Sequence, residues 1–195
     1  MKIILGSASP RRKEILNFFS LPFEQKEPLF DENSFSKEKD PKKFASLIAQ
    51  NKAKSLVEKF PNRIILSADT IVFCEGKIYI KPKTEKDAYE MLSALSGSWH
   101  SVFTGVCVCK DSQLFVQVEE TKILFHPLSK KLIETYHKHF YFKDKAGGYA
   151  IQKAGSIIVK RIEGCYYNIM GLPLNATKDM LALVGINLWD YLKPL

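Results

Sequence analysis

The sequence has no long hydrophobic run, and this absence argues against a membrane-spanning protein. Short apolar runs such as Ile64, Ile65 and Leu66 fall far below the roughly 20 residues that a membrane-spanning helix needs. Residues 1–6 hold one basic side chain and a short apolar run, unlike the longer apolar core of a signal peptide. We therefore expect a cytoplasmic protein with no membrane partner.

Cysteines are few, and their spacing argues against both a disulfide framework and a zinc site. Cys74, Cys107, Cys109 and Cys165 form no C-x-x-C pair. A structural zinc site needs a full set of suitably spaced ligands, and the sequence shows none. Cys107 and Cys109 alternate within an apolar run, so both are expected to point to one side of a strand as buried, reduced thiols.

Acidic residues are in deficit, with 21 aspartates and glutamates against 29 lysines and arginines, which leaves a net charge of +8. This balance favours anionic partners such as nucleotides. A nucleic-acid-binding protein is a weaker alternative, because the chain has no basic helix and its aromatic residues are dispersed. Several lysines are predicted to lie on one solvated helix face, namely Lys37, Lys39, Lys42, Lys43, Lys52 and Lys54.

Alternating helical and strand patterns predict an α/β protein, and the length of 195 residues suits either one large domain or two small lobes. Hairpin-like links around Gly76 and Ser112 favour a mixed sheet over a purely parallel one. Residues 22–40 are polar and are predicted to be irregular. Strands are expected near residues 2–5, 63–74, 77–81, 101–109, 114–125 and 157–161, and helices after caps at Ser9, Asp40, Thr84 and Ser129 and after Pro173.

Ser7, Arg11 and Arg12 lie between the first predicted strand and the first predicted helix. Backbone N–H groups at a helix N-terminus attract anions, and arginines form paired hydrogen bonds with phosphate. The segment suits a triphosphate, although a capped helix with two solvated arginines explains it equally well.

Asp69 interrupts a predicted buried strand, where a charged side chain needs a partner or a task. It is a candidate to bind a divalent metal or activate water, with a structural aspartate as the alternative. The acidic pair Asp31 and Glu32 offers further metal-binding oxygens, with a solvated turn as the alternative. His100 has no nucleophile at suitable spacing, so we expect it to hold a loop by hydrogen bonds.

Two further side chains suit a nucleotide. Lys81 follows a predicted strand directly, where its ammonium group can meet a phosphate as a point charge. Gln152 follows a glycine-containing segment over residues 144–151, and its amide can read the edge of a base.

Six motifs in this order resemble the Maf family of nucleoside triphosphate pyrophosphatases: S-x-S-P-R-R, S-A-D-T, K-P, S-G-x-x-H-x-V-x-T, D-K-A-G-x-Y-x-I-Q and Y-Y-N-x-x-G-L-P. The resemblance runs from Leu5 to about Leu174. It implies a single domain over residues 1–195, whose α/β fold has two lobes around a cleft, similar to inosine triphosphate pyrophosphatases. It also implies release of pyrophosphate from a nucleoside triphosphate with a divalent metal cation (Mg²⁺ or Mn²⁺), a homodimer, and an association with septum formation and cell-division arrest.

The resemblance also implies roles for individual residues. Asp69 matches the carboxylate that accepts a proton, and Glu32 matches an acidic position near the metal. The phosphate-binding set corresponds to Ser7, Arg11, Arg12 and Lys81. Two departures from the family pattern are Ile80, where a glycine is usual, and Cys165, where a serine is usual.

Subfamilies differ at three places, where this chain has Arg11, Thr70 and Gln152. This combination resembles the subfamily that hydrolyses dTTP and UTP, whereas the 7-methyl-GTP subfamily resembles P-W-R-R and S-D-Q at the first two places. Two alternatives stay open: a pyrophosphatase for 7-methyl-GTP or a modified purine, and a non-catalytic regulator of septum formation that acts through a partner.

Overall fold

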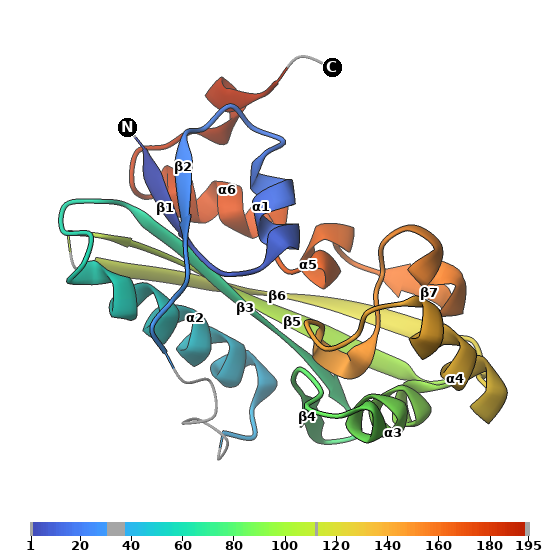
Figure 1. Cartoon of the computed structure of the whole chain (residues 1–195). Coiled ribbons are helices and arrows are strands. Elements are labelled where there is room, and N and C mark those ends of the chain that lie inside the picture. The colour runs from blue at the N-terminus through green and yellow to red at the C-terminus, as the bar shows by residue number, and fades with distance from the viewer. Residues whose placement is uncertain (1, 31–37, 112, 194–195) are drawn as a thin grey trace.

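A seven-stranded mixed sheet organises the chain, in a computed structural model that describes residues 2–30, 38–111 and 113–193 (Figure 1). The sheet runs in the order β2-β1-β3-β5-β6-β7, and β4 pairs with β3. The strands are β1 (Ile3–Gly6), β2 (Phe23–Lys26), β3 (Ile65–Cys74), β4 (Lys77–Tyr79), β5 (Trp99–Lys110), β6 (Gln113–Phe125) and β7 (Val159–Glu163). The α-helices are α1 (Pro10–Leu16), α2 (Pro41–Val57), α3 (Glu85–Leu95), α4 (Lys130–His139), α5 (Tyr166–Met170) and α6 (Leu174–Ala182).

The predicted α/β class with a mixed sheet flanked by helices is confirmed. Strands β1, β2 and β3 pair in parallel, whereas β3–β4, β3–β5, β5–β6 and β6–β7 pair antiparallel. No helix among the described residues is long and apolar enough to cross a membrane. Short 3₁₀ turns at Ala146–Gly148, Lys153–Ile158 and Leu188–Tyr191 complete the described elements.

Local sequence signals set where four helices begin. Ser9, Asp40, Thr84 and Ser129 are the N-caps of α1, α2, α3 and α4, and each side chain accepts a hydrogen bond from a backbone N–H of the first turn. At α3 the cap is a capping box, because the Thr84 and Asp87 side chains each accept a hydrogen bond from the other residue's backbone N–H. Caps of this kind satisfy N–H groups that the helix itself leaves unpaired.

The prediction that residues 22–40 are irregular is wrong for its first part, because β2 pairs in parallel with β1. β2 lies at an edge of the sheet, and all four of its residues are half-buried. Its sequence, FEQK, has one apolar residue and no alternation. The strand therefore depends on backbone pairing with β1, which side-chain patterning does not reveal.

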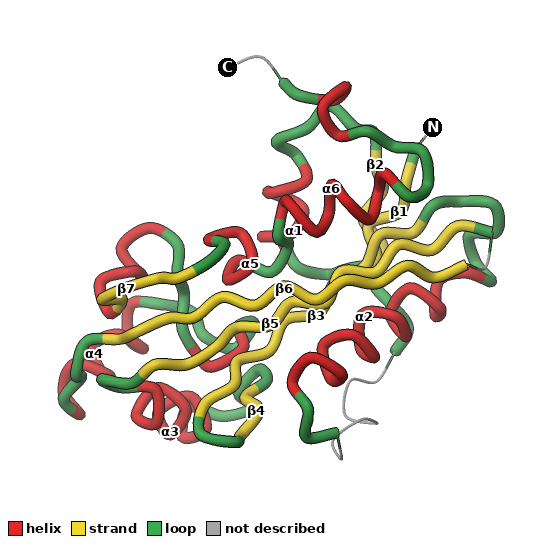
Figure 2. Tube along the Cα trace, turned by 180° about the vertical axis from the view of Figure 1, so that it is seen from behind, coloured by secondary structure: helices red, strands yellow, loops and turns green. Residues whose placement is uncertain are grey.

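Helices cover both faces of the sheet (Figure 2). Helix α2 packs on one face, where Cys107 and Cys109 lie in one buried cluster with Ala49 and Ala53. The prediction that these two cysteines share one side of a strand is confirmed. On the other face, Val106 and Val108 pack in a cluster with residues of α1 and α6. The alternation along β5 therefore builds two cores, one on each side of the same strand.

One edge of β3 changes partner halfway along the strand. Residues 65–67 register with β1, and residues 72–74 register with β4. Asp69 and Thr70 therefore lie between two partner strands, at a place where the sheet edge opens. This change of partner puts polar side chains of a central strand within reach of a cleft.

Candidate active site

A cleft of about 380 Å³ opens where β3 changes partner. Its volume falls within the range typical of small-molecule sites, about 300–1,000 Å³. The cleft brings together residues from the β1–α1 turn, from β3, from the segment after β4 and from the loop after α4. Seven predicted site residues line it: Ser7, Arg11, Arg12, Asp69, Thr70, Lys81 and Gln152.

Asp69 forms a buried ion pair with Lys52 of α2. Lys52 Nζ lies 2.6 Å from Asp69 Oδ1, and both side chains are less than one-tenth exposed. An isolated carboxylate in this position would be strongly destabilised by loss of water, so the ammonium group compensates for its burial. The pair holds the Asp69 carboxylate in one place at the wall of the cleft.

The prediction that Lys52 lies on a solvated face is wrong. On the buried face of α2 it lies among Ile48, Ala49 and Leu56, which are three or four residues away along the helix, and next to the buried Ala53. A lysine inside an apolar stripe was the available signal, because a charged residue there needs a buried partner. The other lysines of the same stretch obscured this signal, because they suggested a solvated face for Lys52 as well.

Arg12 is tied in place by three hydrogen bonds to different elements. Its Nε donates to the Gly171 carbonyl at 2.7 Å, Nη1 to Ser7 Oγ at 3.1 Å and Nη2 to Thr70 Oγ1 at 3.0 Å. Gly171 has a φ of +103°, and a Cβ there would lie 3.1 Å from Thr70 Oγ1. A glycine at this position thus leaves room for the arginine and the threonine to meet.

Asp69 and Thr70 are adjacent but serve opposite faces of the sheet, as successive residues of a strand do. Asp69 points toward α2 and its Lys52, whereas Thr70 contacts Arg12 and also lies 2.9 Å from Thr104 Oγ1. The two side chains therefore have different tasks, since one holds a carboxylate and the other supports a guanidinium group.

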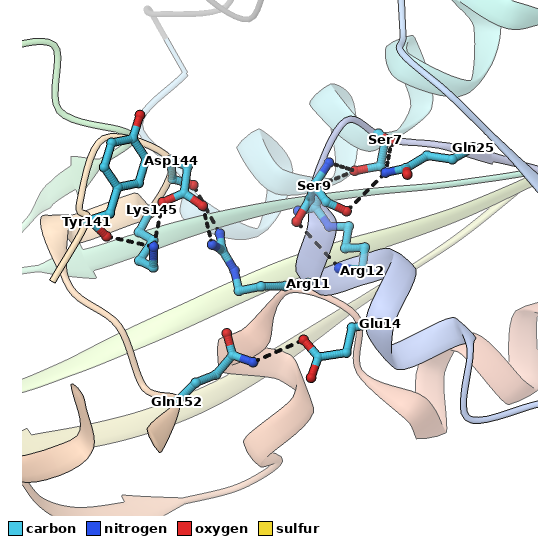
Figure 3. A network of polar contacts seen from close by, with 10 residues as sticks. All are labelled: Ser7, Ser9, Arg11, Arg12, Glu14, Gln25, Tyr141, Asp144, Lys145 and Gln152. Carbon is cyan, nitrogen blue, oxygen red and sulfur yellow. Dashed lines mark hydrogen bonds and ion pairs between the residues drawn. The ribbon is translucent and has the colours of Figure 1, made fainter. Parts of the chain in front are cut away.

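Gln25 of β2 holds the β1–α1 turn by hydrogen bonds, a contact that no sequence pattern predicted. Gln25 Nε2 donates to the carbonyl oxygens of Ser7 and Ser9, at 2.8 and 3.1 Å (Figure 3). Ser7 Oγ in turn accepts from the Ser9 N–H at 3.2 Å. The edge strand β2 thereby holds the turn that brings Ser7 and both arginines to the cleft. In the sequence this contact is marked only by Gln25, a polar residue in a stretch with neither helical nor strand periodicity.

Arg11 reaches across the cleft to the loop after α4. Its Nη1 lies 2.5 Å from Asp144 Oδ2, and its Nη2 donates to the Asp144 carbonyl at 3.0 Å (Figure 3). Lys145 Nζ lies 2.5 Å from the other Asp144 oxygen. Burial opposes ionisation of Asp144, but the hydrogen bond from Lys145 and the charge of Arg11 outweigh it and hold the pKa of Asp144 below its usual value.

Gln152 and Lys81 also line the cleft. Gln152 Nε2 makes a long contact of 3.4 Å to Glu14 Oε2, and its side chain is half-buried. Lys81 is exposed at the cleft margin.

His100 holds the cleft wall from behind, as expected from the sequence. Its Nε2 lies 3.1 Å from Tyr149 Oη, and its ring packs edge-on against Phe125 and Tyr149. Burial lowers the pKa of His100 from 6.5 to about 4. The ring is therefore neutral at physiological pH and supports Tyr149, which lines the cleft.

The donor groups suit a divalent metal that arrives together with a phosphorylated ligand. Within residues 2–30, 38–111 and 113–193, no three His, Cys, Asp or Glu side chains form a metal-binding group. Mg²⁺ is usually held by one or two carboxylates together with substrate phosphates and water. Asp69 and Glu27 both line the cleft and offer such carboxylates. The other predicted metal residue, Glu32, lies outside the described residues.

These features define a class: an α/β protein whose cleft surrounds one buried aspartate with arginine, lysine and serine side chains suited to phosphate groups. The chain belongs to the Maf-like protein family, whose profile matches residues 2–184. The resemblance inferred from the motifs is thus confirmed.

Curated relatives extend this similarity over nearly the whole chain. Proteins from Chlamydia caviae and Syntrophomonas wolfei are each 42% identical, cover 98% and 94% of this chain, and are covered over 98% of their own length. A protein from Thermosipho africanus is 44% identical over 93% of this chain and 92% of its own. All three are named dTTP/UTP pyrophosphatase. Among solved structures, the Ham1 protein of Staphylococcus aureus matches at a TM-score of 0.41 and 12% identity, over 64% of this chain and 72% of that one.

Proposed function

We propose that this protein hydrolyses dTTP and UTP to the nucleoside monophosphate and pyrophosphate. The observation that carries the proposal is the buried Asp69 carboxylate, held by Lys52 at the wall of a cleft that also receives Arg11, Arg12 and Lys81. The names of the relatives support the same activity. The cytoplasmic location, the homodimer, the two lobes and the association with division arrest stay predictions.

The cleft has two chemically different ends. We call one the phosphate end and the other the base end. The base end consists of Asp144, Lys145, Ala150, Ile151 and Gln152, and the phosphate end consists of Ser7, Arg11, Arg12, Lys52, Asp69, Thr70 and Lys81.

At the phosphate end, Asp69 accepts a proton from the water that attacks the α-phosphorus. Lys52 keeps the carboxylate in place for this step. Arg11, Arg12 and Lys81 stabilise the charge that develops on the phosphate oxygens as pyrophosphate leaves. Because Arg12 is held by three hydrogen bonds before any ligand binds, it needs little reorganisation.

A divalent cation, Mg²⁺ or Mn²⁺, would be held by Asp69 together with Glu32 or Glu27 and the triphosphate oxygens. When bound, it neutralises phosphate charge and polarises the bond to the leaving group.

At the base end, Gln152 offers the groups that a uracil or thymine edge requires. An amide donates one hydrogen bond to a ring carbonyl and accepts one from N3–H. Cytosine reverses this pattern at N3 and C4, so it would fit only if the amide turned over, which would bring the amide oxygen against Glu14 Oε2, the present acceptor of Gln152 Nε2. This complementarity supports UTP and dTTP over CTP.

The reaction is tested by the products formed from dTTP with and without Mg²⁺ or Mn²⁺. Attack at the α-phosphorus gives dTMP and pyrophosphate, whereas attack at the γ-phosphorus gives dTDP and orthophosphate. Chromatography separates these products. Accumulation of dTDP, or equal turnover without any divalent cation, would contradict the proposal.

A further inference from the structure

The loop that carries Gln152 is held closed by one buried hydroxyl group. Tyr136 Oη, on α4, lies 3.0 Å from the Ala150 nitrogen, 3.0 Å from the Ala150 carbonyl oxygen and 3.0 Å from the Gly155 carbonyl oxygen. The Ala150 N–H donates to the hydroxyl, and the hydroxyl donates its hydrogen toward the two carbonyls. Both ends of residues 150–155 therefore meet at a single atom.

The backbone between these ends follows a tight path. The Gly155 N–H donates to the Gln152 carbonyl at 3.0 Å, and Lys153 has a φ of +53°, in the left-handed region. A Cβ on Gly155 would lie 2.7 Å from the Ala150 carbonyl oxygen. Gln152 therefore lies at the turn of a loop whose ends are in close contact, so its place depends on how those ends are joined.

Tyr136 itself does not reach the ligand space. It is 5% exposed and packs in a buried cluster with Ile133, Tyr149 and Ile158. The described residues that line the cleft include Ala150 and Gln152 but not Tyr136. Burial raises the pKa of Tyr136 to about 12, so the hydroxyl keeps its hydrogen at any pH near neutrality.

We propose that Tyr136 is a positioning residue for pyrimidine discrimination, because its hydroxyl sets the place of the Gln152 amide by joining Ala150 to Gly155. This inference rests on the proposed function, in which Gln152 reads the base. Tyr136 acts through the loop and contacts neither the phosphates nor the reacting atoms.

The test is Tyr136→Phe, measured with UTP and CTP. The variant keeps the ring in its cluster but leaves the loop ends unjoined, so the UTP/CTP ratio of kcat/KM should fall by roughly 5-fold, as loss of about one hydrogen bond predicts. The fall should come from a higher KM for UTP, while kcat stays within about twofold. Tyr191→Phe, which removes a hydroxyl from the C-terminal 3₁₀ turn, is the matched control and should leave the ratio unchanged.

Gly155→Ala is a second variant that opens the loop while keeping the Tyr136 hydroxyl, because the added Cβ collides with Ala150. It should lower the same ratio, and it decides the question if Tyr136→Phe does not fold. Both variants are compared with Gln152→Ala. If Gln152→Ala loses discrimination while the folded loop variants keep the full ratio, the inference is overturned and the proposed function stands. If Gln152→Ala keeps discrimination, base reading by Gln152 fails, and the role of Tyr136 fails with it.

Discussion

The phosphate end and the base end of the cleft are built in different ways. At the phosphate end, Arg12, Lys52 and Asp69 are buried, and each is bound to other elements of the core. At the base end, Gln152 and Asp144 extend from a loop and are only half-buried. Side chains that are fixed before the ligand binds suit hydrolysis of a triphosphate, because they stabilise the developing charge without reorganisation. A loop that presents polar side chains at the rim of the cleft suits a choice between bases, because one exchanged side chain changes the contact to the base.

Asp69→Asn is the most direct test of the phosphate end and should have the largest effect. The amide cannot accept the proton from water, so turnover of dTTP should fall by about 10²–10⁴-fold while the fold is retained. Steady-state kinetics together with circular dichroism measure both effects. Asp179→Asn, at an exposed aspartate of α6, serves as the control and should keep full activity. Near-normal turnover in folded Asp69→Asn would rule out Asp69 as the base.

Lys52→Met tests whether the phosphate end depends on its buried ion pair. Breaking the pair leaves the Asp69 carboxylate buried without its partner, which should lower the free energy of unfolding by roughly 3–5 kcal/mol. Turnover should fall as well, because the carboxylate is no longer held. Urea unfolding measures the first effect, with Lys54→Met on the exposed side of α2 as the control. Equal stability of the two variants would contradict a structural role for the pair.

Acid should weaken the packing behind the base end. His100 has its pKa lowered from 6.5 to about 4, so below pH 6.5 the unfolded chain binds a proton that the folded protein does not. Stability from the neutral ring is fully present above pH 6.5 and is lost as the pH falls toward 4, by on the order of 3 kcal/mol. Urea unfolding across this range should show the loss, and His100→Gln, which does not titrate, should reduce the slope. An unchanged slope in that variant would assign the acid sensitivity to other groups.

Gln152→Ala probes the base end alone. Loss of one or two hydrogen bonds to the base should lower kcat/KM for UTP by roughly 10-fold and bring UTP closer to CTP. Kinetics with UTP, dTTP, CTP and 7-methyl-GTP measure the change, with Gln113→Ala at an exposed position of β6 as the control. A preference for 7-methyl-GTP in the unaltered protein would overturn the dTTP/UTP assignment.

Thr70→Val gives the smallest expected effect and the cleanest contrast with Gln152. Thr70 marks the subfamily in the sequence, yet its hydroxyl bonds Arg12. Loss of this bond should lower kcat/KM by roughly 5-fold for UTP and CTP alike. Parallel kinetics with both nucleotides would show this uniform fall, and Thr70→Ser should restore most of the activity. A selective loss with UTP would instead assign Thr70 to the base.

Signals that span a few residues predicted much of this protein. Helix starts at Ser9, Asp40, Thr84 and Ser129 follow from caps, because a side chain and the N–H groups it satisfies lie within one turn. Motif order likewise predicted the family and the cleft-lining positions, and hairpin-like links around Gly76 and Ser112 predicted the mixed sheet. Such features depend on residues that are close in the sequence, so they can be predicted without the tertiary structure.

Contacts between distant segments were settled only by the tertiary structure. The partner of Asp69 lies 17 residues away, the Gly171 carbonyl that holds Arg12 lies 159 residues away, and the edge strand β2 exists through its pairing with β1. None of these contacts leaves a periodic signal in the sequence, since each depends on how separate elements pack. Lys52 shows the limit most clearly: its spacing placed it on the buried face of α2, but only the folded sheet brought a carboxylate to meet it.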